Sequence, residues 1–196
     1  MTRHLLSLLA LALTACGTIE PVPEDRFYRL LVAAPDRALE APVLAGLVEV
    51  ERFVADGLVD KTQIVYSEQR APHRLEAYHY HFWTEAPVVM IRDQLVGYLR
   101  TANAATRVVT PELRVAPDFV ITGKIHRLER VVGGPFEAVI ELELGLREEN
   151  SDRLLLLQTY KAAVPTKGET VGDTVLALTR ALDRIFARFV ADLARL

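Results

Sequence analysis

The stretch DFVITGKIHRLERVVGGPFEAVIELELGLREE (residues 118–149) decides the fold. Gly133 and Gly134 separate two runs rich in apolar residues, and paired glycines at such a place are a strong signal for a β-hairpin. After the turn every second residue is apolar, which is typical of a strand with one buried and one solvated face. The stretch therefore predicts two long antiparallel strands over a core. The apolar positions of the second strand are Phe136, Ala138, Ile140, Leu142, Leu144 and Leu146.

The sequence that follows extends this sheet and supplies a helix to cover it. RLLLLQTYKAAV (residues 153–164) has the composition of a third strand. Thr170 and Asp173 have the spacing of a helix capping box. An apolar stripe at three- and four-residue spacing then predicts an amphipathic helix that packs on the sheet. The members of this stripe are Val175, Leu178, Leu182, Ile185, Phe189 and Leu193.

The preceding part of the chain predicts more strands and a second helix. Pro87 suits the first turn of a helix, and Ile91, Leu95 and Leu99 would share one face of it. We therefore predict an α/β fold, a single domain with one mixed or largely antiparallel sheet packed by at least two helices. Runs of strand-like composition lie at 27–32, 46–53, 61–68 and 75–83.

The N-terminal residues predict export and lipid attachment. Arg3 followed by the apolar run 5–13 is typical of a signal peptide, and this run is shorter than the ~20 residues of a membrane span. LTAC (residues 13–16) fits the A-x-A site of the ordinary signal peptidase badly, because Leu13 is not small. It resembles the bacterial lipobox, in which the cysteine is acylated and becomes the first residue. The alternative is a plain secreted protein with a free thiol at Cys16, the only cysteine of the chain.

These signals divide the chain into three parts. We expect a lipoprotein signal peptide at 1–15, a lipidated tether at 16–25 and the folded domain at 26–196. Several acyl chains on Cys16, palmitate among them, would hold the protein stably, since one chain anchors only marginally. Gly17 follows the cysteine where inner-membrane retention usually shows an aspartate. By resemblance to that sorting rule, we expect a lipid-anchored protein on the periplasmic face of the outer membrane.

Composition narrows the class of protein. Hydrophobic residues make up 51% of the chain, which favours a folded body, and the formal net charge is −3. Basic residues do not cluster, so we expect no nucleic-acid partner. No second apolar run is long enough to span a bilayer, which leaves the lipid as the expected contact with the membrane.

Three stretches in the first half of the domain resemble a known family. They are RFVADGLVDKTQIVY (52–66), LEAYHYHFWTEAP (75–87) and IRDQLVGYLR (91–100). Together with the lipobox and the C-terminal helix, they resemble the ABC-type transport auxiliary lipoproteins, the PqiC-like family. The resemblance implies an outer-membrane lipoprotein that works beside an MCE-domain transport protein and its ABC permease and ATPase, moving lipids or other hydrophobic molecules. A homo-oligomer is compatible with it. Of the functional residues, the resemblance carries over only Cys16, as the acylated residue.

The residues do not form a convincing catalytic or cofactor site. Ser67 and Ser151 are the only serines after the signal peptide, and neither lies in a G-x-S-x-G motif. His73, His79 and His81, with His126 further on, could in principle hold zinc, although a solvated strand surface is the simpler interpretation. We therefore expect a non-enzymatic protein without a cofactor. A module that binds lipid in its own pocket, and a zinc-dependent envelope enzyme, are the alternatives.

Two regions are candidates for the surface that contacts a partner. Phe53 and Leu58 flank a turn at Asp56-Gly57, and an exposed apolar loop of this kind is often an interaction site. Packing under the sheet is the alternative for this loop. Trp83 ends an aromatic run that begins at Tyr78, which either packs in the core or forms an interface, where Tyr and Trp are enriched.

Overall fold

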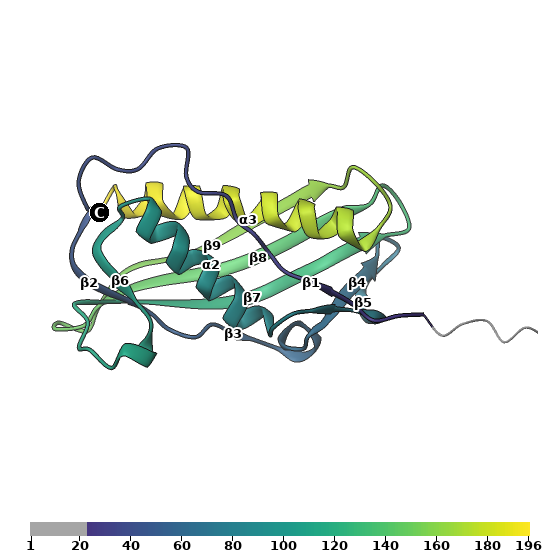
Figure 1. The fold of residues 1–196 in the computed structure, drawn as a ribbon, viewed down its shortest axis with the longest axis horizontal. Helices are drawn as coiled ribbons and strands as arrows, with labels where there is room; N and C mark the ends of the chain where they lie inside the picture. Colours follow the sequence, from purple (N-terminus) through teal and green to yellow (C-terminus); the bar gives the residue numbers. More distant parts are fainter. Residues whose placement is uncertain (1–22) are drawn as a thin grey trace, which may run out of the picture.

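The computed structural model describes residues 23–196, so the predicted signal peptide and the predicted acylation of Cys16 lie outside the described residues. Within the described part, nine strands form one mixed sheet, and two α-helices lie on one of its faces (Figure 1). The expected α/β fold is confirmed. The strands are β1 (Arg26–Tyr28), β2 (Leu44–Val50), β3 (Val54–Ala55), β4 (Gln63–Glu68), β5 (Ala71–Trp83), β6 (Ala105–Val109), β7 (Phe119–Val132), β8 (Glu137–Glu148) and β9 (Arg153–Pro165). The helices are α2 (Pro87–Thr101) and α3 (Val171–Leu193), with 3-10 turns η1 (Gly57–Asp60) and η2 (Pro111–Leu113).

The strand β7 organises the sheet. One edge of β7 pairs antiparallel with β8, which in turn pairs antiparallel with β9. The other edge pairs in parallel with β2, β3 and β4 one after another along its length. Beyond these strands, β6 lies parallel to β2, β5 antiparallel to β4, and β1 parallel to β5. The sequence did not indicate β3 or β6, which are short and carry little periodic pattern.

The glycine turn at 133–134 lies where the sequence predicts it. Val131 of β7 pairs with Glu137 of β8, and Gly133 has a φ of +82°, which side chains of L-residues rarely adopt. The apolar side of β8 faces the helices, and five of its predicted core positions are fully buried: Ala138, Ile140, Leu142, Leu144 and Leu146. The hairpin prediction is confirmed.

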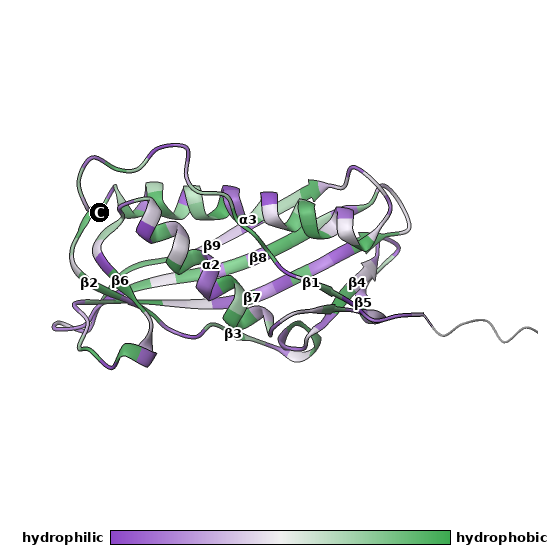
Figure 2. Cartoon of the chain, in the orientation of Figure 1, coloured by the Kyte–Doolittle hydropathy of each residue, from purple (hydrophilic) through white to green (hydrophobic). Residues whose placement is uncertain are grey.

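The helix α3 covers β8 and β9 with the predicted stripe. Its capping box is present, because the Thr170 hydroxyl accepts a hydrogen bond from the Asp173 backbone N–H and the Asp173 carboxylate accepts one from Thr170 N–H. Phe189 is fully buried and meets the ring of Tyr160 edge-on at 6.0 Å. Figure 2 shows hydrophobic residues alternating with hydrophilic ones along α3 and along the strands. Most of the core lies between this face of the sheet and the helices. Burial of each large apolar side chain there contributes about 1.5–3 kcal/mol to stability.

Phe53 does not lie in an exposed loop, and the expectation that it does is wrong. The residue is 1% exposed, between β2 and β3, where the chain runs along β7. Its ring lies against Gly123 of β7, because a Cβ built on Gly123 would come within 2.5 Å of the ring atom Cδ1 of Phe53. The absence of a side chain at Gly123 therefore makes the space in which Phe53 is buried.

We expect Gly123→Ala to lower the free energy of unfolding by about 1–3 kcal/mol, because an added methyl group would overpack the site of the Phe53 ring. Gly97→Ala in α2 is the matched control. A Cβ added at Gly97 would have no neighbouring atom within 4 Å, and replacing a helix-interior glycine should raise stability by about 0.5–1 kcal/mol. Urea denaturation followed by Trp83 fluorescence measures both variants. A Gly123→Ala protein as stable as the wild type would show that the Phe53 ring is loosely packed.

Candidate interaction site

The structure separates the residues that the sequence suggested for partner contact. Trp83 is 3% exposed at the end of β5, where its backbone N–H donates to Thr62 O, so it is a core residue and its placement at an interface is corrected. Leu58, in η1, is 38% exposed, and its neighbour Val54 in β3 is 58% exposed. The β2–β4 connection therefore presents Val54 and Leu58 at the surface, whereas Phe53 is buried beneath it.

The face of the sheet opposite the helices is hollowed beside Val54. The hollow has a volume of about 200 Å³, and its floor is Gly145 of β8, where a Cβ would come within 2.9 Å of Thr122 Oγ1. Leu157 of β9, which is 56% exposed, lies on the other side of it. We call Val54, Gly145 and Leu157 the open-face patch. Its two apolar side chains stand beside a depression that a partner side chain could fill.

Paired charges surround the open-face patch. Lys124 Nζ lies 2.8 Å from Asp56 Oδ2, and this hydrogen-bonded contact raises the pKa of Lys124 and lowers that of Asp56. Further along the same face, Lys161 Nζ lies 2.9 Å from Glu141 Oε1. Such exposed pairs contribute little to stability. They give the apolar patch a polar rim, which is the usual arrangement of a protein–protein interface.

Two of the histidines considered for an alternative zinc site contact other side chains. His81 Nδ1 is 2.8 Å from the hydroxyl of Tyr28, and burial lowers the pKa of His81. His126 Nε2 faces Glu143 Oε2 at 3.5 Å, on the open face of the sheet. Between residues 23 and 196, no three His, Cys, Asp or Glu side chains are grouped so that they could hold a metal ion.

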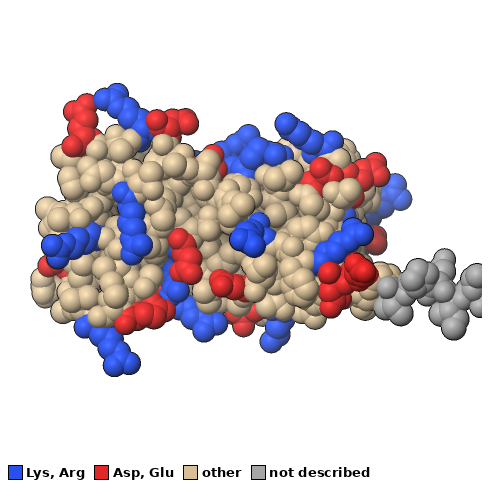
Figure 3. Space-filling model, viewed as in Figure 1, with Lys and Arg blue, Asp and Glu red and all other residues tan. Residues whose placement is uncertain are grey.

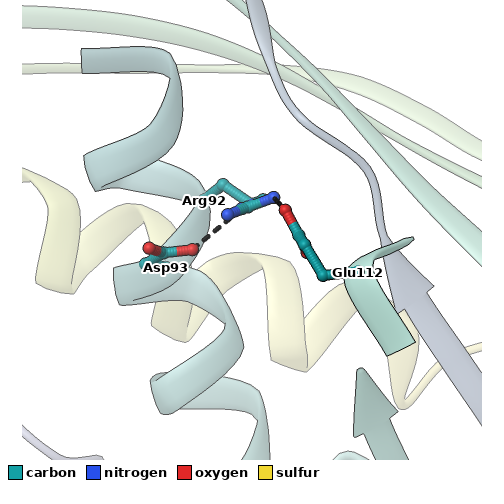
Figure 4. Close-up of polar contacts among 3 residues, drawn as sticks. All are labelled: Arg92, Asp93 and Glu112. Carbon is teal, nitrogen blue, oxygen red and sulfur yellow. Dashed lines mark hydrogen bonds and ion pairs between the residues drawn. The ribbon is translucent and has the colours of Figure 1, made fainter. Parts of the chain in front are cut away.

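A buried arginine joins α2 to η2 (Figure 4). The side chain of Arg92 is 9% exposed, and its Nε and NH1 donate to Asp93 Oδ1 at 2.8 Å and to Glu112 Oε1 at 3.0 Å. Hydrogen bonds from Thr110, from the backbone and from Arg92 lower the pKa of Glu112 to about 2. The segment 110–117, which exposes Leu113 and Val115, is held in place by this contact. No sequence motif indicated this contact, although Arg92 falls four residues after Val88 on the buried side of α2.

A second buried arginine fixes the start of α3. Arg130 of β7 is 6% exposed; it donates to the Tyr78 hydroxyl and to Glu169 O, and its guanidinium lies 4.3 Å from the centre of the Phe136 ring. Its Nε has no hydrogen-bond partner among the described residues. Arg130 therefore connects β5, β7 and the residue before the cap of α3. Its hydrogen bond to Tyr78 holds the first residue of the aromatic run against β7.

The surface on the helix side carries both signs of charge. Figure 3 shows basic and acidic side chains interspersed over this face, with wide neutral areas between them. In the described part of the chain, neither helix combines the length and the apolar character needed to cross a bilayer.

The domain is thus one mixed sheet with both helices on one face and an exposed apolar patch on the other. A family model described as "ABC-type transport auxiliary lipoprotein component" matches residues 28–191. The chain therefore belongs to this family, and the resemblance found in the sequence is confirmed. No curated protein matches the chain at a significant level.

Several solved structures share the fold, among them two crystal structures. A crystal structure of a protein from Xanthomonas campestris superposes with a TM-score of 0.72 at 20% identity, covering 84% of this chain and 92% of that one. A crystal structure of an uncharacterized protein superposes with a TM-score of 0.65 at 15% identity, covering 88% and 98%. At these identities the likeness shows the common fold alone.

We expect Glu112→Gln to make the thermal stability of the protein depend less on pH between about 2 and 4.5. The pKa of Glu112 is lowered from 4.5 to about 2 in the fold, so its stabilising effect is complete above about pH 4.5 and is lost as the pH falls towards 2. Thermal denaturation across the acid range should show a lower Tm for the variant near neutral pH and a gap that closes on acidification.

Glu40→Gln is the control for this experiment, because the Arg37–Glu40 pair is more than four-fifths exposed on both sides. Parallel profiles for Glu112→Gln and the wild type would show that the Arg92–Glu112 contact does not contribute to stability.

Proposed function

We propose that the protein is a non-enzymatic accessory component of a transport system built on an MCE-domain protein with an ABC permease and ATPase. The system would move lipids or other hydrophobic molecules across the cell envelope. The observation that carries the proposal is the family match over residues 28–191, which identifies the chain as a transport auxiliary lipoprotein. The residues that resemble the family in the sequence lie within this match.

The proposed location is the periplasmic face of the outer membrane. Acylation of Cys16 would hold the chain there, and residues 16–25 would separate the lipid from the domain. Gly17 supports the outer membrane by resemblance to the sorting rule. Membership of a lipoprotein family supports the anchor itself.

The proposed contact with the transport partner is the open-face patch together with Leu58. Both helices pack on the opposite face, so Val54 and Leu157 are not needed to close the core (Figure 1). Exposed apolar groups framed by paired charges are typical of surfaces that bind protein partners. The depression over Gly145 offers a place for one inserted side chain.

The alternative function, a module that carries a lipid itself, has less support from the hollows of the domain. A site for an acyl chain should be mostly apolar and should bury most of its ligand. A hollow of about 410 Å³ beside β1 is open to solvent and includes Arg29, Glu85 and Asp93 in its lining. Docking is therefore proposed first, and an acyl ligand co-purifying inside the domain would favour the alternative.

The anchor is tested with Cys16→Ala. We expect this variant to keep residues 1–15 and to carry no acyl chains, because the thioether that precedes cleavage cannot form. Mass spectrometry of the protein extracted from envelopes measures both outcomes. An unmodified Cys16 thiol in the mature wild-type protein would overturn the lipid anchor.

The docking surface is tested with the double variant Val54→Ser and Leu157→Ser. Both side chains are more than half exposed, so the fold should keep its stability within about 0.5 kcal/mol. Losing burial of two apolar side chains at an interface should cost at least ~1.4 kcal/mol, a tenfold weaker association. Co-purification of the MCE protein from crosslinked envelopes, quantified by mass spectrometry, measures the effect.

Leu176→Ser is the matched control, because Leu176 is 60% exposed on α3, away from the patch. A folded double variant that recovers as much MCE protein as the control would exclude the patch as the interface. Failure of the wild-type protein to recover any MCE protein would overturn the proposed partner.

A further inference from the structure

The first strand of the domain presents a second exposed apolar surface, separate from the open-face patch. Phe27 is 65% exposed and Leu31 is 66% exposed. The Phe27 ring stacks on Phe82 of β5 at 5.7 Å, and the two residues are paired in the parallel register of β1 and β5. Tyr80, two residues before Phe82 in β5, is 37% exposed. We call Phe27, Leu31, Tyr80 and Phe82 the tether-side face.

The other side of this segment is fixed in the domain. Tyr28 stacks on His81 with ring centres 5.6 Å apart, and Leu30 is 1% exposed. The backbone N–H of Val32 donates to Gln94 Oε1 of α2 at 2.8 Å. Phe27 and Leu31 are therefore held outward by a segment whose alternate side chains, Tyr28 and Leu30, pack in the domain, and they can bind a surface at a small cost in conformational entropy.

The length of chain between this face and the proposed anchor is short. Arg26 is ten positions after Cys16, and at 3.3–3.6 Å per position this stretch spans at most about 36 Å. The 14 residues of β7 alone extend over about 46 Å, more than the reach of the tether. Figure 1 shows the end at residue 23 and η2 at opposite ends of the molecule. An anchor on Cys16 therefore keeps the tether-side face close to the bilayer and allows η2 to lie far from it.

Charges near the tether-side face are of both signs. Arg26 and Arg29 are exposed next to Phe27, whereas Glu85 and Asp93 line the adjoining hollow. An anionic lipid surface would be attracted by the arginines and repelled by the carboxylates. A zwitterionic headgroup, with a phosphate and an ammonium group, matches both signs.

We infer that the tether-side face rests on the bilayer that holds the lipid anchor. Phe27 and Leu31 would enter the boundary between headgroups and acyl chains, with Tyr80 at the level of the headgroups, where amphipathic aromatic rings are favoured. This contact orients the domain with the η2 end directed away from the membrane. The inference rests on the anchor at Cys16 in the proposed function.

The test uses the full lipidated protein in phosphatidylcholine vesicles. Because Cys16 is the only cysteine and its sulfur would be a thioether, a single new cysteine can be labelled selectively with the fluorophore NBD. The labelled variants are Phe27→Cys, Leu31→Cys and, as controls at exposed leucines far from β1, Leu113→Cys and Leu154→Cys, the latter near the start of β9. We expect nitroxide-labelled lipid to quench NBD at 27 and 31 at least about twofold more strongly than at 113 and 154. Equal quenching at all four positions would overturn the inference.

A second variant separates surface contact from mere closeness to the anchor. NBD on Tyr80→Cys should be quenched by the nitroxide lipid, and Phe27→Ser with Leu31→Ser should reduce that quenching towards the value at 154. Unchanged quenching in the triple variant would show that the tether alone holds the face near the bilayer, and would overturn the contact. Adding phosphatidylglycerol should change the pattern little, and a contact that requires it would overturn the zwitterionic match.

Flotation of the vesicles distinguishes this inference from the proposed function. Protein that floats with acylated Cys16 but shows no position-dependent quenching contradicts the membrane contact alone. Protein that neither floats nor carries acyl chains overturns the anchor, and the inference with it. The recovery of the MCE protein from envelopes is measured independently of both.

Discussion

The pairing of β7 along both edges is the constraint on which the rest of the structure depends. Its 14 residues need hydrogen-bond partners on two sides. β8 supplies one side over nearly the whole length, and β2, β3 and β4 share the other in series. The bulge at Ile125/Arg127 turns both His126 and Arg127 outward and returns Leu128 to the core. A slip of one residue in this register would exchange the buried and solvated faces of the sheet.

Because both helices lie on one face, the sheet has a packed side and an open side with different properties. On the packed side the stripe of α3 meets the apolar positions of β8 and β9. On the open side the side chains are mostly polar and form ion pairs such as Lys161–Glu141, and the exposed apolar side chains of Val54 and Leu157 lie on either side of Gly145. A domain built in this way offers surfaces for contact, which agrees with an accessory role in transport.

Two buried arginines hold elements that the hydrophobic core does not position by itself. Arg92 joins α2 to η2 through Glu112, and Arg130 joins β7 to Tyr78 and to the start of α3. A buried charge is costly unless its hydrogen-bonding groups are matched, so each guanidinium accepts only a narrow geometry of its neighbours. Arg92 fixes the surface segment that contains η2, and Arg130 fixes the start of α3.

Features that rest on local periodicity could be predicted from the sequence. The hairpin of 118–149, the capped helix α3 with its stripe and the helix that begins at Pro87 follow from patterns within a few residues of one another, and the family resemblance agrees with the match over 28–191. Only the tertiary structure decided which apolar residues are exposed. Phe53 is buried because Gly123, 70 positions later, leaves space for its ring, whereas Val54 beside it is exposed. Strand order and burial depend on contacts between distant segments, and no local pattern encodes which segments will meet.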